Sequence, residues 1–103
     1  MYATLRQYKG ITPALFATLM SHQAELEGLI RQTVGFVQYD LVRTRDGVMT
    51  LTVCTDRLGT EVSNFTVAAW IEQHVPAMKA TAPVISGGEH VVHLATSRRA
   101  AFV

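Results

Sequence analysis

The stretch GFVQYDLVRTRDGVMTLTVCTD, residues 35–56, decides the fold because it holds two runs rich in β-branched and aromatic residues around one turn signal. Asp46-Gly47 between such runs is typical of a tight hairpin turn, whose centre needs positive φ. We therefore predict antiparallel strands over 36–45 and 48–55. A two-residue turn at Asp46-Gly47 would place Arg43 opposite Thr50 and Tyr39 opposite Cys54.

Neither face of this predicted hairpin is plainly polar. One face carries Val37, Tyr39, Leu41, Arg43, Thr50, Thr52 and Cys54, and the other carries Phe36, Gln38, Asp40, Val42, Met49, Leu51 and Val53. A sheet that is covered on one side alone alternates cleanly between apolar and polar residues. The mixture indicates that helices cover one face and that something else, such as a second subunit, covers the other.

The segments before the hairpin predict a strand and a helix. Residues 2–8 alternate in polarity, as a first strand would. Thr12 is a good N-cap and Pro13 suits the first helical turn, so a helix is expected to begin there. Its apolar residues recur at helical spacing as far as Val34, and Gly35 is the natural stop. We predict one long amphipathic helix over 13–34.

The segments after the hairpin predict a second helix and a last strand. Thr60 is the expected N-cap of the helix, Pro76 ends it, and residues 77–82 form a connector. The last strand is expected over 84–95, with Gly87-Gly88 as a bulge or bend. The resulting order is the ferredoxin-like βαββαβ arrangement, an α+β fold with a four-stranded antiparallel sheet. We expect one domain over 1–95 and a C-terminal tail over 96–103.

Composition narrows the classes of partner. Hydrophobic residues make up 49% of the 103 residues and charged residues 17%, an apolar surplus that favours a homodimer. A net charge of +1 gives no reason to expect nucleic acid or an anionic membrane surface. Cys54 is the single cysteine, so we expect no internal disulfide, and we interpret it as a small buried residue. The chain shows no leader and no membrane-spanning run, which favours a cytoplasmic protein.

Several short motifs resemble the antibiotic biosynthesis monooxygenase-like domains of the dimeric α/β barrel superfamily. They are YATLRQYKG at 2–10, VGFVQY at 34–39, the Asp46-Gly47 turn, EVSN at 61–64, and the later pairs Pro83-Val84 and Gly88-Glu89. The resemblance extends from residue 1 to about residue 95. It implies a homodimer whose two sheets pack into a barrel, with a pocket in each subunit between sheet and helices.

The resemblance implies one of two functions. The first is a cofactor-independent monooxygenase acting on an aromatic or quinol-like compound; the alternative is a non-catalytic ligand-binding or assembly domain. Tyr39, Asn64, Trp70 and His74 are the ligand-binding residues it suggests, with no catalytic residue assigned and no metal or cofactor expected. Haem-degrading members use a strand-one Asn, a strand-three Trp and a helix-two His. This chain has Gln7 on the first strand and lacks the other two, so haem degradation is not expected.

Helical spacing constrains two of these residues. Asn64 and Trp70 lie six positions apart, so their directions differ by about 120° around a regular helix. They cannot both point straight into one pocket. The alternative is that Trp70 packs in the core or at an interface while Asn64 is exposed.

The four histidines do not form a ligand pair in the sequence. His90 and His93 are three apart on the expected last strand and so should point to opposite faces. His22 and His74 lie on separate helices with no His or carboxylate at i+4 to complete a helical metal pair. That His74 or His93 lines the pocket as an acid or base is a hypothesis.

Charged residues within the strands need partners if both faces are covered, because burying an unpaired charge costs several kcal/mol. We predict an ion pair between Arg6 and Asp40. The functional alternative is that Arg6 or Arg43 holds a carboxylate or enolate of a ligand.

Overall fold

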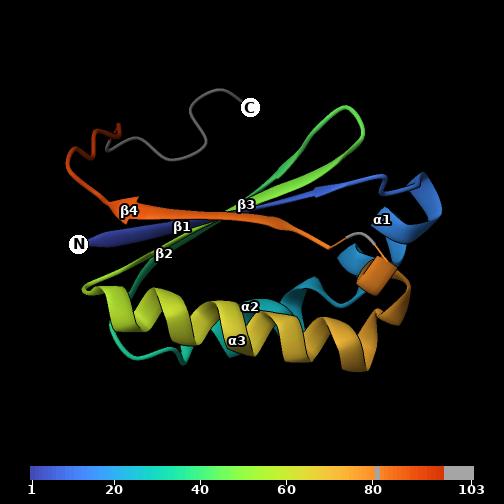
Figure 1. Cartoon of the computed structure of the whole chain (residues 1–103), viewed down its shortest axis with the longest axis horizontal. Helices are drawn as coiled ribbons and strands as arrows, with labels where there is room; N and C mark the ends of the chain where they lie inside the picture. The colour runs from blue at the N-terminus through green and yellow to red at the C-terminus, as the bar shows by residue number, and fades with distance from the viewer. Residues whose placement is uncertain (81, 97–103) are drawn as a thin grey trace.

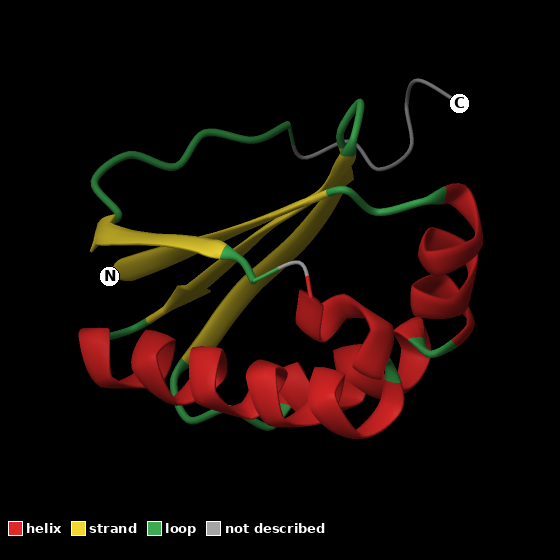
Figure 2. Cartoon of the chain, turned by 45° about the vertical axis from the view of Figure 1, so that its right-hand side comes forward, coloured by secondary structure: helices red, strands yellow, loops and turns green. Residues whose placement is uncertain are grey.

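The computed structural model describes residues 1–80 and 82–96. Its elements in chain order are β1 (Tyr2–Lys9), α1 (Pro13–Ser21), α2 (Gln23–Arg31), β2 (Phe36–Arg43), β3 (Gly47–Cys54), α3 (Arg57–His74), the 3-10 helix η1 (Pro76–Ala80) and β4 (Val84–Glu89). The strands form one antiparallel sheet in the order β2-β3-β1-β4. All helices lie on one side of it (Figure 1; Figure 2). The predicted α+β, ferredoxin-like fold is confirmed.

The predicted hairpin is present, but its register is shifted by two residues. Arg43 pairs with Val48, and Tyr39 pairs with Thr52. The two-residue turn was wrong because Gly47 has no positive φ and pairs with Lys9 as the first residue of β3. A shift of two keeps each of these side chains on its predicted face, since side chains alternate with period two along a strand.

A β-bulge lies at the start of β2, between Phe36 and Gln38. The extra residue is Val37, and it leaves Phe36 opposite Cys54. Phe36 therefore shares a face with Tyr39 rather than with Gln38, contrary to the prediction.

The last strand is shorter and more regular than predicted. β4 pairs with β1 without a break from Val84 to Glu89, so the bulge expected at Gly87-Gly88 is absent there. Glu89 lies opposite Tyr2, and the next amide, of His90, donates to the Met1 carbonyl at 2.8 Å. Residues 97–103 of the predicted tail lie outside the described residues, and the domain limits stay a prediction.

The single helix predicted over 13–34 is two helices. They meet at His22, whose backbone leaves the helical region (φ −105°, ψ 7°), and the second ends at Arg31. The predicted N-cap is confirmed, since the Thr12 hydroxyl accepts the Leu15 N–H at 3.1 Å. The break turns α2 to run beside α3, across the same face of the sheet (Figure 1).

The helix after the hairpin begins earlier than predicted. Asp56, two residues after the end of β3, is its N-cap and accepts the Gly59 N–H at 3.0 Å. Thr60 lies inside the first turns, where its hydroxyl donates to the Arg57 carbonyl at 2.6 Å. A carboxylate one loop residue after the strand caps the helix before Thr60 is reached.

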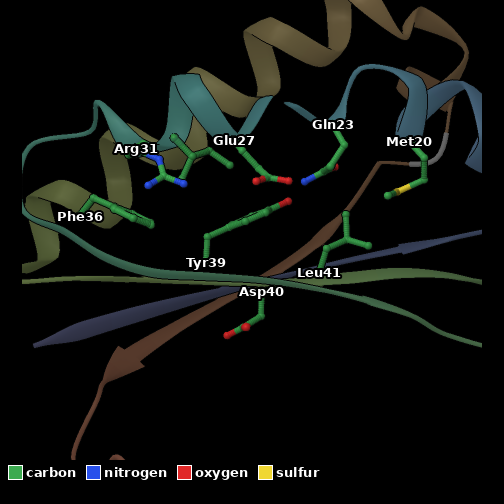
Figure 3. A pocket seen from close by; sticks show the side chains of 9 residues that line it. Met20, Gln23, Glu27, Arg31, Phe36, Tyr39, Asp40 and Leu41 are labelled. Atoms are coloured by element: carbon green, nitrogen blue, oxygen red, sulfur yellow. The ribbon is translucent and has the colours of Figure 1, made fainter. Parts of the chain in front are cut away.

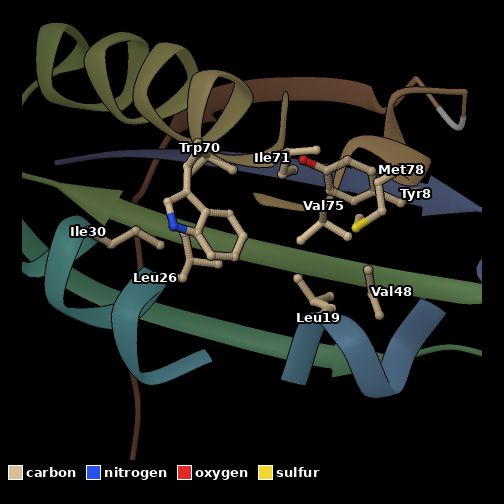
Figure 4. Close-up of a cluster of buried hydrophobic side chains, with 10 residues drawn as sticks. Tyr8, Leu19, Leu26, Ile30, Val48, Trp70, Ile71, Val75 and Met78 are labelled. Carbon is tan, nitrogen blue, oxygen red and sulfur yellow. The ribbon is translucent and has the colours of Figure 1, made fainter. Parts of the chain in front are cut away.

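The interior between sheet and helices has an apolar part and a polar part. The apolar part is a cluster made of Tyr8, Leu19, Leu26, Ile30, Val48, Val67, Trp70, Ile71, Val75 and Met78 (Figure 4). The polar part holds the buried residues Thr4, Arg6, Thr50, Thr52, Thr60 and Ser63. The first part supplies stability by burial; the second places a buried guanidinium among hydroxyl groups.

No helix of the described part of the chain lies on the opposite face of the sheet (Figure 2). Its cross-strand rows are Val42-Met49-Gln7-Val84 and Asp40-Leu51-Leu5-Ser86. Residues 90–96 leave β4 on this side (Figure 2), and their apolar side chains Val91, Val92 and Leu94 are exposed. None of the described helices combines the length and the apolar character needed to cross a membrane.

Candidate functional site

A cavity of about 350 Å³ lies between α2 and β2 (Figure 3). We call it the Tyr39 cavity. The Tyr39 side chain rises from β2 toward α2, and Gln23 and Glu27 on α2 point back toward it (Figure 3). The remaining lining residues are Met20, Ile30, Arg31, Phe36, Asp40 and Leu41. A phenol, an amide and a carboxylate thus surround one hollow with partly apolar walls.

The local electrostatics keep Tyr39 a neutral phenol at neutral pH. Burial raises its pKa above the usual value, while a hydrogen bond from the Gln23 side chain and the positive charge of Arg6 oppose the increase. The carbonyl oxygen of Gln23, Oε1, is buried and has no hydrogen-bond partner among the described residues. Leaving a buried acceptor unpaired costs about 1–3 kcal/mol. This atom is therefore a position where a donor on a bound molecule would be stabilised.

A second polar centre surrounds Arg6 on β1, which is 1% exposed. Its Nε donates to Thr50 Oγ1 at 3.2 Å, its Nη2 donates to Thr52 Oγ1 at 3.1 Å, and its Nη1 donates to Asn64 Oδ1. The Asn64 amide nitrogen in turn donates to Thr4 Oγ1 at 3.1 Å. Every acceptor of the guanidinium is uncharged.

The predicted ion pair between Arg6 and Asp40 is wrong. Asp40 lies opposite Leu51, which lies opposite Leu5, so its side chain is on the other face of the sheet from Arg6. There it accepts a hydrogen bond of 2.6 Å from Gln38 Nε2. Within the described residues, Arg6 forms no ion pair with a carboxylate.

Trp70 and His74 lie elsewhere, between α3 and α2. Trp70 is 4% exposed and stacks on His74 with ring centroids 5.1 Å apart. Glu25 Oε1 lies 3.1 Å from His74 Nε2 and accepts from Trp70 Nε1 at 3.4 Å. The His22 ring is 5.9 Å from that of His74, so the fold joins two histidines that the sequence left apart. In the sequence, the three-residue spacing of His22 and Glu25 was the one signal of this grouping.

The four residues suggested by the resemblance therefore occupy three places. Tyr39 lines its own cavity, Asn64 contacts Arg6 and Thr4, and Trp70 packs with His74 in the contact between helices. Asn64 is half-buried rather than exposed. The structure does not bring the four residues together, and their roles in ligand binding stay a prediction.

The other candidates from the sequence have ordinary surroundings. The rings of His90 and His93 are 6.0 Å apart; the predicted opposite orientation assumed a strand, and β4 ends at Glu89. The Arg43 guanidinium lies 4.2 Å from the centre of the Phe16 ring. Over residues 1–80 and 82–96, no group of three or more His, Cys, Asp or Glu side chains could hold a metal ion.

The sequence matches no family model and no curated protein. Solved structures do match. A protein of unknown function from Nitrosomonas europaea, NE2512, shares 14% identity over 94% of this chain and 95% of that chain, with a TM-score of 0.74.

Two oxygenases are also similar in structure. A monooxygenase from the gene ActVA-Orf6 of Streptomyces coelicolor, in complex with Nanaomycin D, shares 14% identity over 93% of this chain and 92% of that chain, with a TM-score of 0.64. SnoaB, a cofactor-independent oxygenase from Streptomyces nogalater, shares 20% identity over 94% of this chain and 96% of that chain, with a TM-score of 0.53. The chain thus has the fold seen in antibiotic biosynthesis monooxygenase structures.

Proposed function

We propose that this protein binds a small aromatic molecule of the phenol or quinol type in the Tyr39 cavity and oxidises it as a cofactor-independent monooxygenase. The observation that carries the proposal is the unpaired Gln23 Oε1 beside the Tyr39 phenol. A hydroxyl group of the ligand would donate to this oxygen once the Gln23 amide group turns it toward the cavity. Its ring would pack against the apolar walls supplied by Met20, Phe36 and Leu41.

The chemistry requires a base and a hydrogen-bond donor. With anthrone as substrate, the base removes a proton from the central carbon, and the resulting carbanion adds to dioxygen. The peroxide then loses water to leave anthraquinone, so one oxygen atom enters the product and the other enters water. We assign the proton removal to the Glu27 carboxylate. The neutral Tyr39 phenol would donate to the developing enolate oxygen.

Two of the structural neighbours support this proposal. One is described as a monooxygenase in complex with Nanaomycin D, and the other as a cofactor-independent oxygenase. Both share this fold at low identity, so the assignment of chemistry to this chain depends on the cavity itself.

The test is dioxygen consumption with anthrone and with a quinol, measured beside ligand affinity. We expect turnover by the wild type and a loss of about 100-fold or more in Glu27→Gln, the typical contribution of a positioned base. Asp46→Asn removes an exposed carboxylate in the hairpin loop and should leave turnover unchanged. Binding without turnover would favour the alternative, a non-catalytic ligand-binding domain. The position of Trp70 and His74 outside the Tyr39 cavity supports that alternative. If the protein neither binds nor turns over these compounds, the proposal is overturned.

We also propose a homodimer in which the helix-free faces of two sheets pack together, in a barrel. Large apolar side chains on this face support it, among them Leu5 at 39% and Val42 at 50% exposed. Native mass spectrometry of freshly purified protein tests the proposal. A dimer with added mass would also identify the ligand class, whereas a monomer would contradict the assembly. We place the protein in the cytoplasm, a proposal that cell fractionation tests.

A further inference from the structure

Among the described residues, the buried Arg6 guanidinium has no anionic partner. Its contacts are with two hydroxyl groups and one amide oxygen, all uncharged. Burial lowers the pKa of the Arg6 guanidinium, while Tyr8, Tyr39 and Cys54 raise it, and the group stays charged at neutral pH. Burial raises the pKa of Tyr8 and of Tyr39, so these phenols are neutral and do not balance the charge.

This arrangement leaves binding capacity unused. A guanidinium has five N–H groups, and the three hydrogen bonds use one on each nitrogen. Nη1 and Nη2 each keep a second N–H without an acceptor among the described residues. Burying an unpaired charge costs several kcal/mol, and bonds to neutral oxygens offset only part of that. An oxyanion would satisfy both the charge and the remaining donors.

A hollow of about 320 Å³ lies beside this centre, although Arg6 itself is not among its lining residues. We call it the β4 hollow, since it lies between β4, β1 and the first turns of α3. Thr4 and Asn64 line it, and Asn64 accepts from Arg6. Gly87 pairs with Thr4 and so shares its face of the sheet, where the absence of a side chain keeps the space open. At the rim, Arg57 and Glu61 pair at 3.0 Å, so their charges offset each other.

We propose that the β4 hollow is a binding site for a small organic carboxylate, held by Arg6. A carboxylate oxygen would replace the Asn64 amide oxygen at Nη1 and use the second N–H groups. The hollow lies next to β4 and the Tyr39 cavity lies next to β2, at opposite edges of the sheet. The proposal therefore concerns a different site from the oxygenase proposal, although the Arg6 charge also acts on Tyr39.

The test uses benzoate as the probe and benzamide as its neutral counterpart. Isothermal titration of the full chain should show that benzoate binds at least about tenfold more tightly than benzamide. This factor corresponds to the smaller end of the range of free energies for a hydrogen bond to a charged group. Benzoate, and not benzamide, should move the Arg6 Nε–Hε resonance in NMR spectra. Arg6→Met should abolish the preference, and Arg45→Met, in the exposed hairpin loop, should retain it.

Gly87→Val tests the hollow without touching the charge, which matters if Arg6→Met fails to fold. Its side chain would fill the space above Thr4, so benzoate affinity should fall at least about tenfold while thermal unfolding remains cooperative. Glu27→Gln should leave benzoate affinity unchanged, which separates this site from the oxygenase proposal. Equal affinity for the two probes, an unmoved Arg6 resonance, or unchanged benzoate binding in Gly87→Val would each overturn the inference.

Discussion

Gly47→Ala is the substitution whose effect follows most directly from the packing of backbone on backbone. A Cβ at this position would lie 1.8 Å from the Tyr8 carbonyl oxygen, and ordinary contact begins at 3.4 Å. The two strands would have to separate by about 1.6 Å. That movement would break the ladder at this end and the 2.9 Å bond from the Ile11 amide to the Asp46 carbonyl. It would also pull Val48, 1% exposed, away from Tyr8.

Two or three backbone hydrogen bonds at about 1 kcal/mol each, with partial loss of one core contact, amount to a loss of about 3 kcal/mol in the free energy of unfolding. Urea denaturation followed by circular dichroism measures it. Gly28→Ala is the matched control, because nothing lies within 4 Å of its added Cβ in α2. There alanine should stabilise by about 0.5–1 kcal/mol through helix propensity. A loss below about 1 kcal/mol in Gly47→Ala would refute the reasoning.

Three further predictions concern individual side chains. Asp56→Ala should lower the free energy of unfolding by about 1 kcal/mol, since the Gly59 N–H loses its cap; an unchanged urea midpoint would count against it. Trp70→Phe should cost about 1–3 kcal/mol through a smaller buried ring and a lost bond to Glu25, yet leave anthrone affinity unchanged in titrations; weaker binding would show a ligand role. Burial raises the pKa of Tyr8 above 10.0, so the unfolded chain loses the Tyr8 proton first and the free energy of unfolding falls as the pH rises above about 10. Tyr8→Phe should reduce that fall in urea titrations at several pH values, and an equally steep fall would contradict the account.

The faces of the hairpin could be predicted from the sequence more reliably than its register. Tyr39 and Thr52 share a face in any register that differs from the observed one by an even number of residues. The predicted register depends on Asp46-Gly47 forming the centre of the turn. The structure gives Gly47 a different role, the close approach of β3 to Tyr8 on β1.

The candidate site depended on contacts that no local pattern reports. Arg6 and Asp40 were paired because both are charged residues within strands, but their faces follow from the pairing of β1 with β3 and of β3 with β2. The break at His22 fixes the direction of α2, and only then do Gln23 and Glu27 point at Tyr39 (Figure 3). Helical periodicity alone continues smoothly through that position.

The exposure of β4 has a consequence for how the fold opens. All six of its residues are exposed, and among the described strands it pairs with β1 alone. Detaching β4 would therefore uncover little apolar surface, whereas β3 lies between two strands and buries Val48, Val53 and Cys54 almost completely. Amide hydrogens of β4 should exchange with deuterium through this local opening, long before those of β3, which wait for the whole domain to unfold. The wall of the β4 hollow is then the part of the sheet that samples an open state most often.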